Sequence, residues 1–181
     1  MDTDLVTRAQ RGDTEAFAIL ASACADRFLA TSRRILRDLA LAEDATQQAL
    51  IAIWRDIPQL RDPARFEAWS YRLLVRACYA EGRKSRAWAP NLRLLSSDEP
   101  AADVLGSVID RDRLDRAFAR LSFDHRTVIV LQHYLDLTLA EITEVLGIPK
   151  GTVASRAHHA MRALRAALDA DERGSAAEAA R

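Results

Sequence analysis

Residues 138–156 carry the side chains whose types and spacing point most directly to a chemistry. Thr152, Ser155 and Arg156 recur at helical spacing, so two hydroxyl groups and a guanidinium share one helix face. Hydroxyl groups donate hydrogen bonds to phosphate oxygens, and a guanidinium matches either a phosphate or a guanine edge. The pattern therefore predicts a helix that binds DNA.

Two short helices joined by a glycine turn are expected to position this face. Thr138 and Glu141 form a capping-box pattern, Gly147 suits a left-handed helix end, and Pro149 suits the start of the next helix. The arrangement is typical of a helix-turn-helix, whose second helix enters the major groove. An ordinary helical hairpin remains the alternative. Four apolar side chains are expected where the two helices touch: Ile142, Leu146, Ile148 and Val153.

Charge is unevenly distributed along a chain whose net charge is zero. Residues 71–93 have a net charge of +5, residues 149–168 have +4, and residues 97–115 between them have −4. Such runs are often no more than solvated faces. Their positions instead indicate two DNA-facing modules joined by a segment that avoids phosphates.

Composition favours an all-α protein. The 181 residues include only six Gly and five Pro, and the hydrophobic fraction of 49% excludes global disorder. No apolar run is long enough to span a bilayer, and residues 1–4 lack the pattern of a signal peptide. Cys24 and Cys78 are not spaced as a redox pair, so we expect two core thiols in a reducing cytoplasm.

The pattern divides the chain into two small helical domains, residues 5–85 and 108–168, with a flexible linker at 86–107 and a frayed tail at 169–181. Trp88, Leu92, Leu94 and Leu95 are unusual in a solvated tether and indicate packing on a domain or on a partner. Helical periodicity is expected from Thr14 to Leu36 and over residues 41–57, 64–84, 110–121, 124–135, 138–146 and from 149 onward. One stripe of the 64–84 helix is expected to be buried: Phe66, Trp69, Leu73, Ala77 and Ala80.

Metal and cofactor chemistry find no support in the sequence. His125, His133, His158 and His159 lack the spacing of zinc ligands. We find no glycine-rich phosphate loop and no nucleophile motif, so we expect no metal, no cofactor, no small-molecule substrate and no catalytic residues.

The order of the motifs resembles that of bacterial sigma-70-type factors. Residues 41–57, LAEDATQQALIAIWRDI, resemble the polymerase-binding helix of sigma region 2, and residues 66–86, beginning FEAWSYR, resemble the −10 recognition helix. Residues 113–168 resemble the −35 domain, region 4. A chain with only these two domains is similar to the extracytoplasmic-function (ECF) group, and the resemblance covers roughly residues 5–168.

The resemblance implies three sets of contact residues. The set for the polymerase core, its β′ and β subunits, is Asp44, Gln47, Gln48 and Trp54; for Trp54 a place in the core is the preferred alternative. The set for the melted −10 strand is Arg61, Arg65, Arg72, Arg76, Arg83 and Lys84, with rings from Tyr71 and Trp69, the latter also suited to the core. The set for the −35 duplex is Lys150, Thr152, Ser155, Arg156, His158 and His159.

Three positions depart from the family pattern and bear on base readout. Arg76 replaces an Asn, Ala80 replaces an acid or amide, and Ala154 replaces a Lys or Arg. A guanidinium pairs with a base edge differently from an amide, so the base read at −10 is left open.

The resemblance implies a sigma factor that binds core RNA polymerase and recognises the −35 and −10 elements of promoter DNA, without catalysis of its own. It also implies an anti-sigma protein as a possible further partner. Two other functions stay open. One is a stand-alone helix-turn-helix regulator, and the other is a sigma-like protein that sequesters a partner without initiating transcription.

Overall fold

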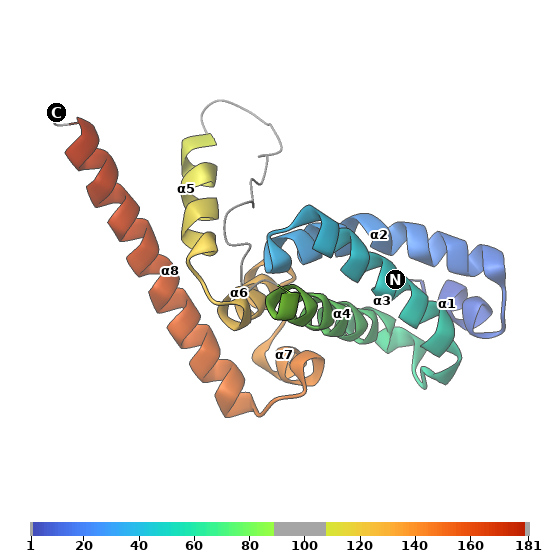
Figure 1. Cartoon of the computed structure of the whole chain (residues 1–181). Coiled ribbons are helices and arrows are strands. Elements are labelled where there is room, and N and C mark those ends of the chain that lie inside the picture. The colour runs from blue at the N-terminus through green and yellow to red at the C-terminus, as the bar shows by residue number, and fades with distance from the viewer. Residues whose placement is uncertain (1, 89–107, 180–181) are drawn as a thin grey trace. The chain divides into compact units, whose positions relative to one another are not determined.

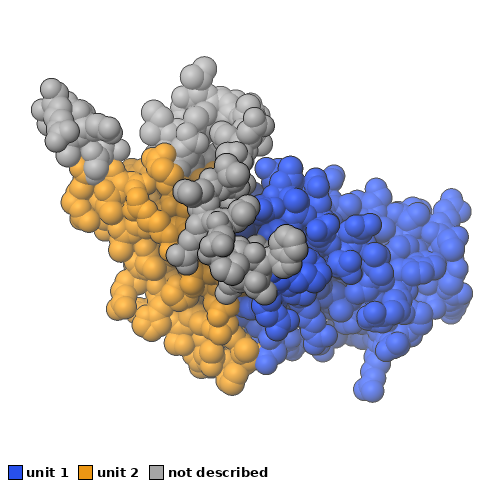
Figure 2. Space-filling view, in the orientation of Figure 1, with its two compact units in different colours: residues 1–96, 143–147 blue, residues 97–142, 148–181 orange. Residues whose placement is uncertain are grey.

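The computed structural model describes residues 2–88 and 108–179, and the regular elements in these two stretches are all helices (Figure 1). The chain divides into two compact units (Figure 2). The first comprises residues 1–96 together with 143–147, and the second comprises residues 97–142 and 148–181. The all-α prediction is confirmed.

Four helices form the first unit: α1 (Thr3–Gln10), α2 (Thr14–Leu36), α3 (Leu39–Asp56) and α4 (Phe66–Trp88). Carboxylates fix two of the starts, because Asp13 accepts from the Ala16 N–H at 3.0 Å and Asp38 accepts from the Leu41 N–H at 2.9 Å. Two 3-10 turns, η1 (Ile57–Gln59) and η2 (Pro63–Arg65), connect α3 to α4. Helix α1 was not predicted from the sequence.

Small side chains on α3 bring the first unit together. The buried face of α3 includes Ala42, Ala45, Ala49 and Ile53, none more than 2% exposed. Alanine side chains let neighbouring helices approach closely, and α2 and α4 both pack on this face (Figure 1). Larger side chains fill the remaining space, among them Phe28 of α2 and Leu74 of α4.

The buried stripe of α4 differs from the expected one. Phe66 is buried as predicted, but Trp69, Leu73, Ala77 and Ala80 are only partly buried. The core instead takes a neighbouring stripe that contains polar residues: Ser70, Tyr71, Leu74, Val75, Cys78 and Glu81. Because buried serine, tyrosine and glutamate are uncommon, hydrophobicity alone selected the wrong side of this helix.

Both cysteines are buried and free, as expected of core thiols. Burial raises the pKa of Cys78 to about 11, and its Sγ lies 3.4 Å from the Ser32 hydroxyl. A neutral thiol is a poor nucleophile, so Cys78 is a packing residue at neutral pH.

The second unit is built around α8 (Lys150–Ala179), with α5 (Val108–Ala119) and α6 (Phe123–Ile129) packed on it. Its apolar core is formed by Ala117, Leu121, Ile129, Ala160, Leu164 and Ala167. A π-helical turn, η3 (Val130–Tyr134), follows α6, where the sequence predicted uninterrupted α-helix. Helix α7 (Leu139–Leu146) precedes α8 and crosses the division between the units at residue 143.

Helix α8 extends beyond residue 168, which corrects the expectation of a frayed tail from 169 onward. Asp171 holds this extension, because its side chain is only 7% exposed and lies 3.2 Å from Arg116 of α5 and 2.7 Å from Arg120, the residue that follows α5. Arg113 also donates to the Leu168 carbonyl at 3.2 Å. The sequence showed the alanines of this segment but not its partners, which are some 55 residues away.

Most of the predicted linker lies outside the described residues, including Leu92, Leu94 and Leu95. The structure assigns residues 86–88, at the start of that linker, to α4.

Asp171→Ala is expected to destabilise the second unit. The change leaves two arginines without their carboxylate. We expect the free energy of unfolding to fall by about 1–3 kcal/mol, with the low end of that range favoured because both arginines are exposed to solvent. Urea unfolding and amide exchange of α5 and α8 measure the effect. Asp169→Ala, which removes an exposed acid from the same helix, is the control. Equal stability of the two variants would contradict a stabilising role for the contacts of Asp171 with Arg116 and Arg120.

Candidate functional site

The outer face of α3 forms a continuous stripe of polar and apolar side chains. Asp44, Gln47, Gln48, Ile51 and Trp54 are exposed and recur at helical spacing, opposite the alanines that face α2 and α4. Ile51 is 51% exposed and Trp54 is 44% exposed. A carboxylate and two amides at one end and two large apolar groups at the other are typical of a protein-binding surface.

Trp54 is not a core residue, which corrects the preferred interpretation of its position. Its ring meets that of Phe17 from α2 edge to face, with centroids 4.6 Å apart. One side of the indole is therefore held by the fold while 44% of the side chain stays exposed. An aromatic side chain held in place loses little entropy when it anchors a partner.

A glutamine from α1 fixes the loop that precedes α4. The Gln10 amide donates to the carbonyls of Ile57 at 3.2 Å and Leu60 at 2.6 Å. Asp62 then accepts from the Ala64 N–H at 3.0 Å and starts η2. These bonds set the course of a loop whose two arginines, Arg61 and Arg65, are exposed.

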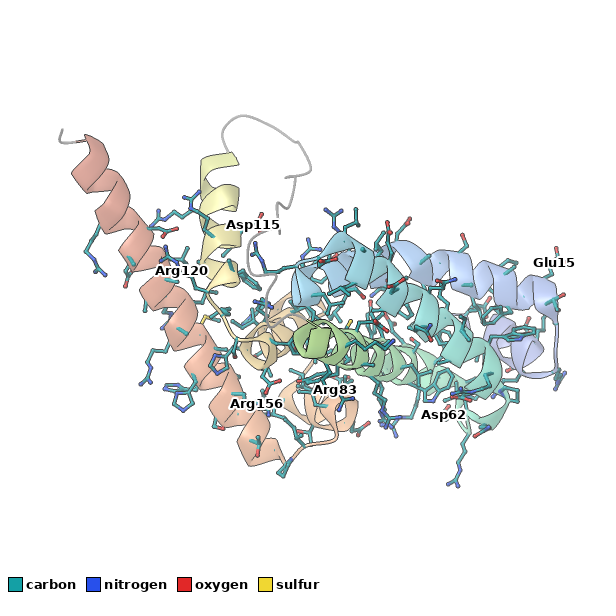
Figure 3. All side chains as sticks on the ribbon, in the orientation of Figure 1. Glu15, Asp62, Arg83, Asp115, Arg120 and Arg156 are labelled. Atoms are coloured by element: carbon teal, nitrogen blue, oxygen red, sulfur yellow. The ribbon has the colours of Figure 1, made fainter. Side chains whose placement is uncertain are left out.

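One face of α4 presents cations beside half-buried apolar groups. Trp69, Arg72, Leu73 and Arg76 lie on this face, and Arg83, labelled in Figure 3, continues it two turns later. Arg76 and Arg83 are exposed, whereas Arg72 is partly buried. The ring of Trp69 lies 6.0 Å from that of Phe66 and is partly buried, as expected for a largely structural residue.

Two side chains expected on this surface have other partners. Tyr71 is 3% exposed, and its ring lies 5.3 Å from Phe28 with the Arg27 guanidinium 5.7 Å from its centre, so it offers no ring to a base. Lys84 donates to Glu81 at 2.7 Å, and the Glu81 side chain is only 7% exposed. Lys84 therefore neutralises a buried carboxylate, and much of its charge is compensated.

The capping box predicted at the start of α7 is present. The Thr138 N–H and hydroxyl donate to the Glu141 carboxylate at 2.8 and 2.7 Å, and the Glu141 N–H donates to the Thr138 hydroxyl at 3.3 Å. These bonds lower the pKa of Glu141. Gly147 ends the helix with a φ of +67°, a conformation that favours glycine.

The apolar positions around the turn are buried to different degrees. Ile142 and Val153 are fully buried, as expected. Leu146 and Ile148 are only partly buried, and Val145, at 3% exposed, takes a buried position that the sequence analysis did not assign.

The expected DNA-binding side chains share one side of α8. Thr152, Ser155, Arg156 and His159 recur at helical spacing, with Lys150 before them and His158 beside them. Lys150, Ser155, His158 and His159 are exposed, while Thr152 and Arg156 are partly buried. The Ser155 hydroxyl donates to the Thr152 carbonyl at 3.0 Å, and Arg162 lies 3.5 Å from His159 Nδ1. The face is thus both cationic and rich in donors.

Arg156 is already engaged by an acid. Its Nη2 lies 3.1 Å from Oδ2 of Asp124 in the first turn of α6, and its side chain is 30% exposed. The sequence analysis did not identify Asp124, because nothing in its local pattern relates it to a residue 32 positions later.

The described residues contain neither a cluster of metal ligands nor a helix suited to span a membrane. No group of three or more His, Cys, Asp or Glu side chains there is arranged to hold a metal ion. No helix in the same residues has both the length and the apolarity needed to cross a membrane.

Comparison with known protein families assigns each half of the chain. Residues 20–88 match the family model "Sigma-70 region 2", and residues 117–166 match "Sigma-70, region 4". The ECF RNA polymerase sigma factor SigL of Mycobacterium tuberculosis is 33% identical over 139 residues, which covers 75% of this chain and 78% of SigL. The chain belongs to the ECF RNA polymerase sigma factors. It is therefore a sigma factor that directs transcription initiation.

Other members of the family match nearly the whole chain. The ECF sigma factor SigW of Bacillus subtilis is 28% identical over 176 residues, covering 90% of this chain and 94% of SigW. The RNA polymerase sigma-H factor of Pseudomonas aeruginosa is 29% identical over 180 residues, covering 92% and 93% of the two chains.

Solved structures agree on the fold. The sigma factor RpoE of Bartonella quintana, in complex with the anti-sigma factor NepR, has a TM-score of 0.72 and 22% identity, covering 86% of this chain and 98% of that one. CnrH, in complex with the cytosolic domain of CnrY, has a TM-score of 0.69 and 24% identity, covering 94% and 98%. At these identities the likeness concerns the fold alone.

For this ECF sigma factor, the residue-level contacts predicted from the sequence stay predictions. The structure groups the expected residues on three surfaces, one each on α3, α4 with its preceding loop, and α8. It adds Ile51 and Asp124 to them. Ile51 had a signal in the sequence, because it is an apolar residue on the polar side of an amphipathic helix.

Thr138→Ala is expected to destabilise the start of α7 by about 1 kcal/mol at neutral pH. The folded pKa of Glu141 lies below its ordinary value of 4.5, so the box contributes fully above that pH and is lost as pH falls below it. The difference between wild type and Thr138→Ala, measured by amide exchange of α7, should therefore shrink below pH 4.5. A cost that does not change with pH would contradict the role of the charged Glu141.

Proposed function

We propose that three surfaces divide the work of this sigma factor. The exposed stripe of α3 (Asp44, Gln47, Gln48, Ile51 and Trp54) binds core RNA polymerase. The cationic face of α4, with its preceding loop, binds the melted −10 strand. The outward face of α8 binds the −35 duplex.

The composition of the α3 stripe supports a protein partner. Ile51 and Trp54 expose large apolar surfaces that are costly to leave in water, and Trp is a common anchor of interfaces. Asp44, Gln47 and Gln48 supply acceptors and donors that fix orientation. The carboxylate makes a basic-edged surface of the polymerase the fitting partner.

The α4 face has the features needed for single-stranded DNA. Arg61, Arg65, Arg76 and Arg83 are exposed and supply cations along the backbone path. Apolar groups between them, Trp69 and Leu73, are only partly buried and can contact unstacked bases. Arg76 offers a guanidinium where an amide is common in the family, which favours a base edge rich in acceptors.

The α8 face has the features needed for duplex DNA. Hydroxyl, imidazole and ammonium groups surround Arg156, and residues 149–168 contain no acid. A Cβ at Gly151 would meet nothing within 4 Å, so packing inside the chain does not require a glycine there. Close approach to a phosphate is a reason for one.

We further propose that catalysis belongs to the polymerase and that the chain works in the cytoplasm, where the polymerase and the promoter are. The two solved structures named above are complexes, one of a sigma factor with an anti-sigma factor. That supports an anti-sigma protein as a regulator of this chain too.

Co-elution of the purified chain with bacterial core RNA polymerase, followed by transcription from a promoter library, tests the proposal. We expect a stable complex and initiation at a defined motif. A complex without initiation would indicate a sequestering protein. Duplex binding without a polymerase complex would indicate a stand-alone regulator.

The double variant Asp44→Ala, Gln47→Ala is expected to bind core polymerase at least about ten-fold more weakly, because two orienting polar groups are lost. Fluorescence anisotropy of the labelled chain measures the affinity. Ser22→Ala with Asp26→Ala, at two exposed positions of α2, is the matched control. If the two double variants bind equally well, the polymerase surface lies elsewhere.

Arg156→Ala is expected to weaken holoenzyme binding to a −35 duplex by about 1–3 kcal/mol if the guanidinium reads a base edge. Arg165→Ala removes the same charge from the opposite side of α8 and controls for electrostatics. Equal losses in the two variants would indicate that Arg156 contributes only charge.

A further inference from the structure

We propose that Asp124 is a positioning residue that determines how specifically Arg156 reads a base. The proposal rests on the assignment of the α8 face to the −35 duplex. It concerns a contact between two helices of the same unit, α6 and α8, whose apolar residues Ile129, Ala160 and Leu164 pack in one core with Leu121, which lies just before α6.

The position of Asp124 is fixed by the fold. Ser122 caps α6, accepting from the His125 N–H at 3.3 Å, and Asp124 lies in the first turn that follows. A carboxylate is favourable there because it faces the positive end of the helix dipole. The shared core then holds this turn opposite the second turn of α8, where Arg156 begins its side chain.

The ion pair occupies only part of the guanidinium. Nη2 of Arg156 lies 3.1 Å from Oδ2 of Asp124, and the Arg156 side chain is 30% exposed to solvent. A guanidinium has five N–H groups in one plane, so a carboxylate on one edge leaves other donors for a guanine. Orienting the plane in advance reduces the entropy lost when the arginine binds a base.

Electrostatic attraction between this surface and DNA would not by itself favour an acidic residue at position 124. The neighbouring side chains on α8 are Lys150, His158, His159 and Arg162, as expected for a surface that meets phosphates, and Asp124 repels phosphates. The Arg156–Asp124 pair is close to neutral, so it contributes little to general attraction for DNA. The guanidinium of this pair can still form directional hydrogen bonds to a base, and such bonds are the basis of sequence discrimination.

Removing the carboxylate should therefore change affinity and specificity in opposite directions. We expect Asp124→Ala to bind a scrambled duplex about two- to three-fold more tightly, because a repulsive charge is lost. The same variant should lose about five-fold in discrimination between the promoter duplex and the scrambled one, because Arg156 is no longer held. Asp124→Asn keeps an acceptor oxygen without the charge, so it should retain most of the discrimination.

The experiment uses holoenzyme assembled from core polymerase and the full chain. The probes are a promoter duplex selected from a randomised pool by transcription and the same duplex with its −35 region scrambled. Affinities for both probes are measured for wild type, Asp124→Ala, Asp124→Asn, Arg156→Ala and the double alanine variant. Thermal unfolding of each variant identifies any loss of fold.

Coupling between the two residues decides the outcome. We expect Asp124→Ala to cause no further loss of discrimination once Arg156 is alanine. Equal changes in affinity for both probes, or the same loss of discrimination with and without Arg156, would overturn the role of Asp124 and leave the −35 assignment intact. Unchanged discrimination in Arg156→Ala would instead overturn the recognition face itself, and with it the coupling.

Discussion

The close packing of α3 between α2 and α4 is the constraint on which the first unit depends. Ala42, Ala45 and Ala49 are fully buried, and their small side chains let α2 and α4 approach this face of α3 closely. The opposite face must then be exposed, with Ile51 and Trp54 on it. The surface proposed for the polymerase is thus a consequence of core geometry, and the same packing leaves the cationic face of α4 outward.

Three acidic residues act in a consistent way in the two units. Glu81, Asp124 and Asp171 each bond to a lysine or arginine, and Glu81 and Asp171 are nearly buried. Each therefore fixes a cation or a helix without presenting an unbalanced negative charge to phosphates. The basic blocks in the sequence are thus only partly available for DNA. Lys84 and Arg156 have compensated charges, while Arg76 and Arg83 are exposed.

Local pattern was enough to predict much of the fold. The capping box at Thr138 and the glycine turn at Gly147 depend on neighbours in sequence and were predicted correctly. The failures have a common cause. The buried face of α4 includes Ser70, Tyr71 and Glu81, which hydrophobic periodicity does not select. Asp124 and Asp171 matter because of arginines far away in the sequence, and the ring of the exposed Trp54 is held by Phe17 of α2. Contacts between distant segments follow from tertiary packing, which spacing in the sequence does not encode.

The central claim is that two separate surfaces of one chain read two parts of one promoter while the polymerase holds them together. The most direct test is transcription by reconstituted holoenzyme from a randomised promoter library, with the active sequences read for wild type, Arg76→Ala and Arg156→Ala. We expect Arg76→Ala to relax the motif only in the −10 element and Arg156→Ala only in the −35 element. A change of the same kind in both elements for either variant, or no change for both, would contradict it.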